Sequence, residues 1–156
     1  MSIDEEQNKR SPNLLCELGN HLECVYAVRW SSSGFYLASA GEGQLVMVHA
    51  SMGQPSGNDS YELVTTLYGH LDSILDLSWS HGDQWLASSS VDNMIIIWNA
   101  HQWPKNVTTL RGHSGLVKGI AFDPTGKYLA SQSDDKSLRV WRVSDWTEEV
   151  VISEPF

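Results

Sequence analysis

The chain of 156 residues contains only two cysteines, Cys16 and Cys24, and only five prolines. Two cysteines are too few for the disulfide framework of a small secreted domain, and no Cys-x-x-Cys motif occurs, so the composition fits a reduced compartment. Long hydrophobic runs are missing as well, because no apolar stretch approaches the roughly 20 residues of a membrane-spanning helix. We therefore expect a chain without membrane spans whose core is held by non-covalent contacts.

Basic side chains are also scarce, with 10 Lys and Arg against 19 Asp and Glu and a formal net charge of −9. Residues 1–104 carry 12 acidic and 3 basic side chains, whereas residues 105–156 carry 7 of each. Proteins bind nucleic acids through clustered Lys and Arg, so the composition argues against direct nucleic-acid binding. It is compatible with basic protein partners, and ordinary solubilising surface charge explains it equally well.

Sequence motifs of catalysis and metal binding are missing too, since the chain has no HExxH, GxSxG or P-loop pattern. Asp134 and Asp135 could be read as a paired carboxylate or a metal site, but they fall in a turn between predicted strands, where a structural role is favoured. Three of the six histidines recur at one position of a repeat and are also expected to be structural. We expect no catalytic residue, no cofactor, no metal and no enzyme activity.

The chain does contain a repeat. Its clearest copy, residues 112–141, reads GHSGLVKGIAFDPTGKYLASQSDDKSLRVW, in which three apolar runs are separated by turn residues. Two earlier copies start at His21 and His70, which lie 49 residues before His70 and 43 residues before His113, respectively. In each copy an aromatic residue follows nine positions after the His, and Leu-Ala-Ser comes after that. A period of roughly 40–45 residues with Gly-His near the start and a late Trp is typical of WD-repeat β-propellers.

We therefore predict an all-β fold, a WD-repeat β-propeller with three four-stranded blades at about 25–67, 74–110 and 117–152. Propellers have about four blades or more, so three blades are an incomplete part of a larger ring or must assemble with other chains. Residues 14–156 form this partial propeller, and the polar residues 1–13 are expected to be a flexible linker. Leu14–Glu17 is expected to be a strand of a blade that lies outside this chain.

The twelve strands of the blades are expected from alternating apolar and β-branched residues between turn signals. Their expected ranges are Val25–Trp30, Phe35–Ser39, Leu45–Val48, Tyr61–Leu67, Ile74–Trp79, Trp85–Ser89, Met94–Trp98, Val107–Leu110, Val117–Phe122, Tyr128–Ser131, Leu138–Trp141 and Glu149–Ile152.

Each repeat supplies residues for a buried polar clip between the loop before a blade and the central strands of that blade. A carboxylate can bind the imidazole, the imidazole a hydroxyl, and the hydroxyl an indole N–H, so that each group has a partner. In the first repeat, Gly43 replaces the Asp and His49 replaces the Trp, so we expect this blade to be the least rigid. The two complete clips are His70, Ser88, Asp92 and Trp98, and His113, Ser131, Asp135 and Trp141.

Candidate partner-binding residues lie at the end of the blades that carries the loops between blades. They occupy equivalent positions near the start of each first strand or just before the clip aspartate, and plain exposed surface is an equal alternative for each of them. These residues are Tyr26, Leu75, Lys118, Val91 and Asp134. Four tryptophans at repeat positions, Trp30, Trp79, Trp98 and Trp141, are expected to face the core, and Trp85, Trp103 and Trp146 are freer candidates for partner contacts.

A closer resemblance appears once variable positions are included. The stretches NHLECVYAVRWSSSGFYLAS, SVDNMIIIWNA, LRGHSGLVKGIAFDPTGKYLASQSDDKSLRVWR and SDWTEEVVISEPF resemble the amino-terminal WD-repeat domain of the HIRA/Hir family of histone-chaperone subunits. The resemblance covers roughly residues 11–156 and implies the second to fourth blades of a seven-bladed ring. The chain departs from the family pattern at Gly43 and His49, and the other blades and the carboxy-terminal region are missing from it.

The resemblance implies a non-catalytic scaffold in the nucleus, acting in replication-independent nucleosome assembly and transcriptional repression. It implies ubinuclein-type and calcineurin-binding-protein-type subunits and a histone co-chaperone as partners, with histones bound indirectly. A generic WD-repeat adaptor, such as a ubiquitin-ligase substrate receptor, is the alternative, because one fold serves many functions.

Overall fold

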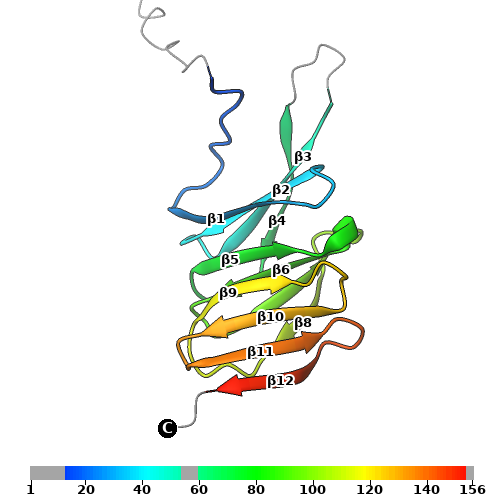
Figure 1. The fold of residues 1–156 in the computed structure, drawn as a ribbon. Helices are drawn as coiled ribbons and strands as arrows, with labels where there is room; N and C mark the ends of the chain where they lie inside the picture. Colours follow the sequence, from blue (N-terminus) through cyan, green and yellow to red (C-terminus); the bar gives the residue numbers. More distant parts are fainter. Residues whose placement is uncertain (1–12, 54–59, 154–156) are drawn as a thin grey trace, which may run out of the picture.

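The computed structural model describes residues 13–53 and 60–153, which form three antiparallel sheets of four strands each. The sheets stack in chain order, from the cyan first blade through the green second blade to the yellow-to-red third blade (Figure 1). The predicted all-β fold with three four-stranded blades is therefore confirmed. The predicted linker lies outside the described residues except for Asn13, which is exposed in a turn.

Each sheet is a simple meander, and every strand end lies within three residues of its predicted position. The first blade consists of β1 (Val25–Trp30), β2 (Tyr36–Gly41), β3 (Leu45–Ser51) and β4 (Tyr61–Tyr68). The second consists of β5 (Ile74–Trp79), β6 (Trp85–Ser90), β7 (Ile95–Asn99) and β8 (Asn106–Leu110). The third consists of β9 (Val117–Phe122), β10 (Tyr128–Ser133), β11 (Ser137–Arg142) and β12 (Thr147–Ser153).

The hairpin between the first two strands of each blade contains left-handed backbone, at one residue in the first and third blades and at two, Gly82 and Asp83, in the second. Gly34 and Gly126 supply it in the first and third blades, with φ of 77° and 75°. Asp83 occupies the equivalent position of the second blade with φ of 59°, at the end of the short 3-10 turn η1 (His81–Asp83). This turn is the only helical element of the described residues, and no helix in this part of the chain is long and apolar enough to cross a membrane.

The hydrophobic core is divided into two layers, one between each pair of neighbouring blades. Small and β-branched side chains on one blade receive larger side chains from the next, which is how flat sheets pack closely. The first layer contains Ala27, Ala38, Ala40, Val46, Val48 and Leu67 of the first blade against Ile74, Leu77, Leu86, Ile96 and Trp98 of the second. The second layer contains Ala87, Ile95, Ile97 and Leu110 against Val117, Ile120, Leu129 and Trp141.

Two sequence predictions about the edges of the stack are wrong in this structure. Trp30 was expected in the core but is 53% exposed, because no blade among the described residues packs on the face of the first blade where it lies. Leu14–Glu17 carries no strand. A β-strand needs a partner for its backbone hydrogen bonds, and the sheet that this segment would complete is not among the described residues.

The three tryptophans expected to be free for partners are instead packed at the blade interfaces. The Trp103 ring meets those of Tyr36 and Trp79 edge to face, each at a centroid distance of 6.1 Å. The Trp85 and Trp146 rings pack edge to face at 5.6 Å, beside the second core layer. These residues lie in loops or at strand ends, and their packing follows from the stacking of blades rather than from the repeat pattern.

Candidate interaction surface

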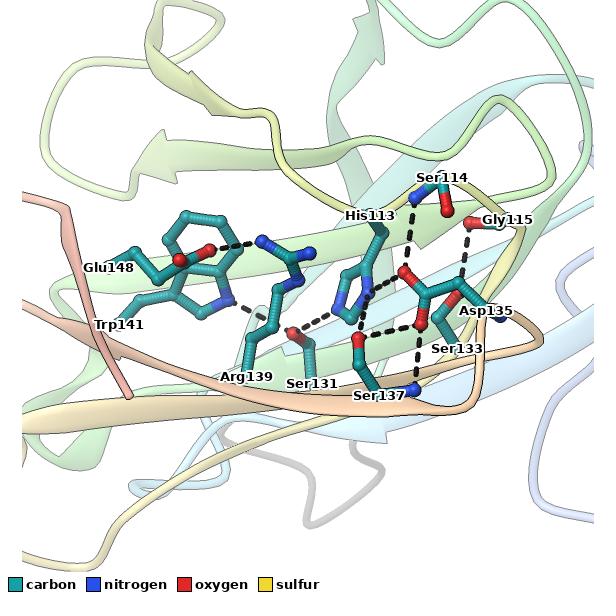
Figure 2. Close-up of polar contacts among 10 residues, drawn as sticks. All are labelled: His113, Ser114, Gly115, Ser131, Ser133, Asp135, Ser137, Arg139, Trp141 and Glu148. Atoms are coloured by element: carbon teal, nitrogen blue, oxygen red, sulfur yellow. Dashed lines mark hydrogen bonds and ion pairs between the residues drawn. The ribbon is translucent and has the colours of Figure 1, made fainter. Parts of the chain in front are cut away.

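The clip of the third blade joins one loop and two strands (Figure 2). His113 lies in the loop before β9, and its Nδ1 is 2.8 Å from Asp135 Oδ2 in the turn between β10 and β11. His113 Nε2 is 2.8 Å from Ser131 Oγ, and Trp141 Nε1 donates to the same hydroxyl at 3.0 Å. Because an ionised carboxylate only accepts, the imidazole donates from Nδ1 and the Ser131 hydroxyl donates to Nε2, so every group has a partner.

The Asp135 carboxylate is held in its charged form by further donors. It accepts the backbone N–H of Ser114 at 3.0 Å, the N–H of Ser137 at 2.8 Å and the Ser137 hydroxyl at 2.6 Å. Burial raises the pKa of Asp135, but the hydrogen bonds from Ser137, His113 and Ser114 outweigh burial and hold the pKa well below its usual range. The carboxylate thereby fixes the loop before the blade to the turn between β10 and β11.

The second blade repeats this geometry. His70 Nδ1 is 2.8 Å from Asp92 Oδ2 and His70 Nε2 is 2.8 Å from Ser88 Oγ. Trp98 Nε1 donates to Ser88 Oγ at 3.0 Å, and the N–H of Leu71 donates to Asp92 at 3.0 Å. The structure thus brings all eight predicted clip residues together in two sets of four.

The first blade has only part of a clip. His21 Nε2 is 2.7 Å from Ser39 Oγ, but Gly43 offers no carboxylate to the other imidazole nitrogen. His49 Nε2 is 3.3 Å from Asn20 Oδ1, and the buried Nδ1 of His49 has no hydrogen-bond partner. Burial and, to a smaller extent, the charge of His21 lower the pKa of His49. A hollow of about 730 Å³ lies beside Gly43, between the loops that precede the first and second blades.

The five predicted partner-binding residues lie at the end of the blades that the clips hold. In each blade a backbone hydrogen bond ties the turn to the start of the first strand, from Glu42 to Cys24, from Val91 to Ser73 and from Asp134 to Leu116. We define the loop-end surface as Tyr26, Leu75, Val91, Lys118 and Asp134.

The loop-end surface differs from blade to blade. Lys118 and Asp134 form an ion pair at 2.5 Å in the third blade, with about half of each side chain exposed. Leu75 and Val91, the equivalent residues of the second blade, are half-buried and apolar. Tyr26 is 53% exposed in the first blade, and the carboxylate of Glu42 raises its pKa. The surface therefore offers an aromatic, an apolar and a charged patch in succession.

Two aspartates that connect blades were missed by the sequence analysis. Asp76 accepts from Arg29 of the first blade at 2.8 Å and from the backbone N–H of Ile120 in the third blade at 3.1 Å, so it touches all three blades. Asp83 accepts from the Ser32 hydroxyl at 2.9 Å and from the Ser33 hydroxyl and N–H. For Asp76 the sequence held a signal, because this strand position is occupied by Ala27 and Gly119 in the other repeats.

The polar groups of the clips at this end of the blades are committed to holding loops in place. Among the described residues, no group of three His, Cys, Asp or Glu side chains lies close enough to hold a metal ion. The perturbed carboxylates Asp92 and Asp135 are occupied by the loops that they fix. What the clips provide is a set of rigidly placed side chains at one end of the stack, which suits recognition of a protein partner.

Solved structures share the fold. The chain superimposes on "Structure of U3-55K" with a TM-score of 0.78 at 21% identity, covering 88% of this chain and 41% of that one. The crystal structure of the RRP9 WD40 repeats gives the same TM-score, identity and coverage. At this identity the likeness establishes the WD-repeat propeller fold alone.

Sequence relatives are more specific. The chain is 50% identical to Protein HIRA of Takifugu rubripes over 116 residues, which is 67% of this chain and 11% of that protein. It is 47% identical to Protein HIRA of Homo sapiens over 114 residues and 40% identical to that of Zea mays over 108 residues, each again 11% of the relative. The chain thus aligns with about a tenth of the length of these relatives. A family model described as the CAF1B/HIR1 beta-propeller domain matches residues 1–153, and the chain belongs to this family of WD-repeat propellers.

Proposed function

We propose that this chain is a non-catalytic scaffold segment that holds protein subunits of a histone-chaperone assembly through its loop-end surface. It acts in the nucleus, in nucleosome assembly outside replication and in transcriptional repression. The observation that carries the proposal is the family match over residues 1–153, since the geometry alone supports protein binding of any kind.

The partners that the family membership suggests are ubinuclein-type and calcineurin-binding-protein-type subunits and a histone co-chaperone. Histones reach the assembly through these subunits. The net charge of −9 supports protein rather than nucleic-acid partners. The Lys118–Asp134 ion pair and the exposed Tyr26 ring are the groups best placed to anchor a subunit, because both are accessible and aromatic and paired charged side chains often anchor interfaces.

The test is binding of purified chain to a ubinuclein-type subunit, measured by titration calorimetry. Lys118→Glu should weaken binding by about tenfold or more in Kd, because it reverses a charge at the centre of the contact. The matched control is Lys127→Glu, which makes the same charge change in the exposed hairpin at the opposite end of the third blade and should leave Kd unchanged.

Equal affinities for the two variants would remove the loop-end surface as the binding face. Affinity purification of the tagged chain separates the broader alternatives. Recovery of histone-chaperone subunits would support the proposal, and recovery of cullin-type ubiquitin-ligase subunits in their place would overturn it.

A further inference from the structure

The hollow of about 730 Å³ beside Gly43 is formed by the first blade and by the loops before the first and second blades. The apolar part of its lining comes from Leu45, Met47 and Tyr68. Met47 is buried, whereas Tyr68 is 73% exposed. Such a lining can cover the hydrocarbon stem of a long side chain while the charged end of that side chain stays in contact with water.

The polar part of the lining is negatively charged. Glu23, Glu42 and Asp72 line the hollow, and all three are exposed. No Lys or Arg of the described residues lines it. Burial lowers the pKa of the lining His21, so this imidazole is uncharged at pH 7 and does not offset the carboxylates. We define this site as the acidic hollow.

The carboxylates of the acidic hollow have no cationic partner in the described part of the chain. Asp72 accepts only from the neighbouring N–H of Ser73, at 2.7 Å, and Glu23 and Glu42 have no hydrogen-bond or ion-pair partner there. Carboxylates elsewhere are paired with Arg or Lys, namely Asp76, Asp134, Asp145, Glu148 and Glu149. A concave site with one sign of charge concentrates a ligand of the opposite sign.

The corresponding place in the second blade is occupied by side chains of the chain itself. Asp92 stands at the position of Gly43 and is bonded to His70. Arg111 stands at the position of Tyr68, two residues before the clip His of the next blade, and it donates to the sulfur of Met94 at 3.0 Å. The first blade has neither the Asp nor the Arg. The acidic hollow therefore follows from residue differences within the repeat.

We propose that the acidic hollow receives a basic side chain, Arg or Lys, from the protein subunit that the loop-end surface holds. This inference rests on the proposed function and adds to it the chemistry of the contact. The stem of the basic side chain packs on Leu45 and Tyr68, and its charged end lies among the three carboxylates. In the second blade, Arg111 of the chain itself occupies the equivalent place.

The acidic hollow is continuous with the loop-end surface. The carboxylate of Glu42 raises the pKa of Tyr26, so the negative charge of the hollow reaches this exposed ring. A basic side chain in the hollow and an adjoining residue on Tyr26 can therefore belong to the same segment of the partner. Nucleic acid does not fit this site, because its phosphates would be repelled by the carboxylates.

The experiment is an NMR titration of the ¹⁵N-labelled 156-residue chain with the peptide acetyl-Gly-Gly-Arg-Gly-Gly-amide. We expect saturable shifts of the backbone N–H signals of Gln44 and Ser73, which line the hollow. The same peptide with citrulline in place of arginine has nearly the same shape without the charge, and it should cause no such shifts. Binding of the citrulline peptide with equal affinity would overturn the proposal.

Neutralising a carboxylate tests the charge. Glu23→Gln and Glu42→Gln should each raise Kd for the arginine peptide by about fivefold, the upper end of what an exposed ion pair contributes. The matched control is Glu62→Gln, an exposed carboxylate at the opposite end of β4, which should leave Kd unchanged. Equal weakening by Glu42→Gln and Glu62→Gln would show attraction to the net charge of the chain instead of a site.

Filling the hollow tests its shape. A Cβ at residue 43 would lie 3.8 Å from the Cβ of Glu23, so the side chain of Gly43→Leu enters the hollow without a change of charge. This variant should abolish the shifts, while Gly43→Ala, which adds only the Cβ, should keep them. Unchanged binding by Gly43→Leu would overturn the proposal.

Titration of the ubinuclein-type subunit separates this inference from the proposed function. If the chain binds the subunit with a Kd that Glu42→Gln leaves unchanged, the acidic hollow is not the contact and the scaffold proposal stands. If the chain binds the arginine peptide in the hollow but binds no subunit, the scaffold proposal fails and the hollow remains a site for basic side chains.

Discussion

At the residue scale, the hydroxyl of Ser88 is the centre of the second clip. It accepts from Trp98 Nε1 and bonds His70 Nε2, and it is completely buried. Buried polar groups are costly when one partner is removed, because the remaining groups lose a hydrogen bond without gaining water. The clip is therefore more sensitive to loss of a single member than the average net value of its bonds suggests.

Trp98→Phe should lower the free energy of unfolding by about 1–3 kcal/mol, because the Ser88 hydroxyl loses its indole donor. The control is Trp103→Phe, since Trp103 Nε1 is buried without a partner and its removal costs no hydrogen bond. Urea unfolding of both variants checks this prediction. A neutral Trp98→Phe would show that the clip contributes nothing to stability.

The incomplete clip of the first blade predicts a gain in stability on substitution. The backbone at Gly43 is outside the left-handed region, and a Cβ there would meet Glu23 and Leu45 at ordinary distances of 3.8 and 3.9 Å. Gly43→Asp should therefore place a carboxylate beside His21 and stabilise the chain by about 0.5–1.5 kcal/mol, the net value of one hydrogen bond.

Combining Gly43→Asp with His49→Trp should stabilise the first blade further, because an indole N–H would then be available to Ser39. Thermal melting of the single and double variants tests this, with Gly43→Ala as the control that adds a Cβ without a carboxylate. A Gly43→Asp variant no more stable than Gly43→Ala would rule out repair of the clip.

At the element scale, β5 contacts both neighbouring blades, and Asp83 of η1 joins the second blade to Ser32 and Ser33 of the first. We call this contact the latch. Asp83, the last residue of η1, accepts from Ser32 and Ser33 in the hairpin of the first blade. Burial raises the pKa of Asp83, but the hydrogen bonds from Ser33 and Ser32 outweigh burial and leave the pKa lowered. This latch accounts for an Asp with positive φ at a position where the other blades have Gly.

The latch predicts that the free energy of unfolding depends on pH. A carboxyl whose pKa is lowered by folding stabilises the fold above its unfolded pKa of about 3.9, and the contribution disappears as the pH falls through the folded pKa. Asp83→Asn should therefore be less stable than the parent chain at pH 7, and the difference should narrow progressively below about pH 4. Urea midpoints across this range measure it.

The matched control for the latch is Asp72→Asn, at an exposed residue whose side chain accepts only from the neighbouring N–H of Ser73. It should change stability little at any pH. If the difference in urea midpoint between Asp83→Asn and the parent chain stays constant from pH 7 to pH 3, the latch does not contribute as described.

The repeat pattern predicted the elements well because it is a property of single blades. Strand alternation places β1, β5 and β9 at their predicted residues, and the spacing of His70, Ser88 and Trp98 predicts two hydrogen bonds within one blade. Contacts between blades are different, since neither Asp83 nor the tryptophans of the loops belong to the repeat. Their partners become identifiable only when the blades are stacked, which is why the sequence did not predict the packing of Trp103 and Trp146 at the interfaces between blades.

At the scale of the whole molecule, stability depends on the interfaces between blades. Each blade buries its flat faces only against neighbours, and within residues 13–53 and 60–153 the second blade is packed on both faces while the first and third are each packed on one. In repeat proteins the stability is approximately a sum of terms for single units and terms for their interfaces. The number of repeats in the sequence indicated how many interfaces the blades form. The composition of the outer faces of the first and third blades could be read only from the stacked structure.

This sum predicts a gradient of protection in a single copy. In the single chain, amide hydrogens of β5–β7 should exchange most slowly, and those of β1–β3 and β9–β11 faster, because opening the first or third blade breaks one interface and opening the second blade breaks two. Hydrogen exchange followed by mass spectrometry resolves these segments. Equal protection of all three blades would mean that each blade is stable by itself and that the interfaces add little.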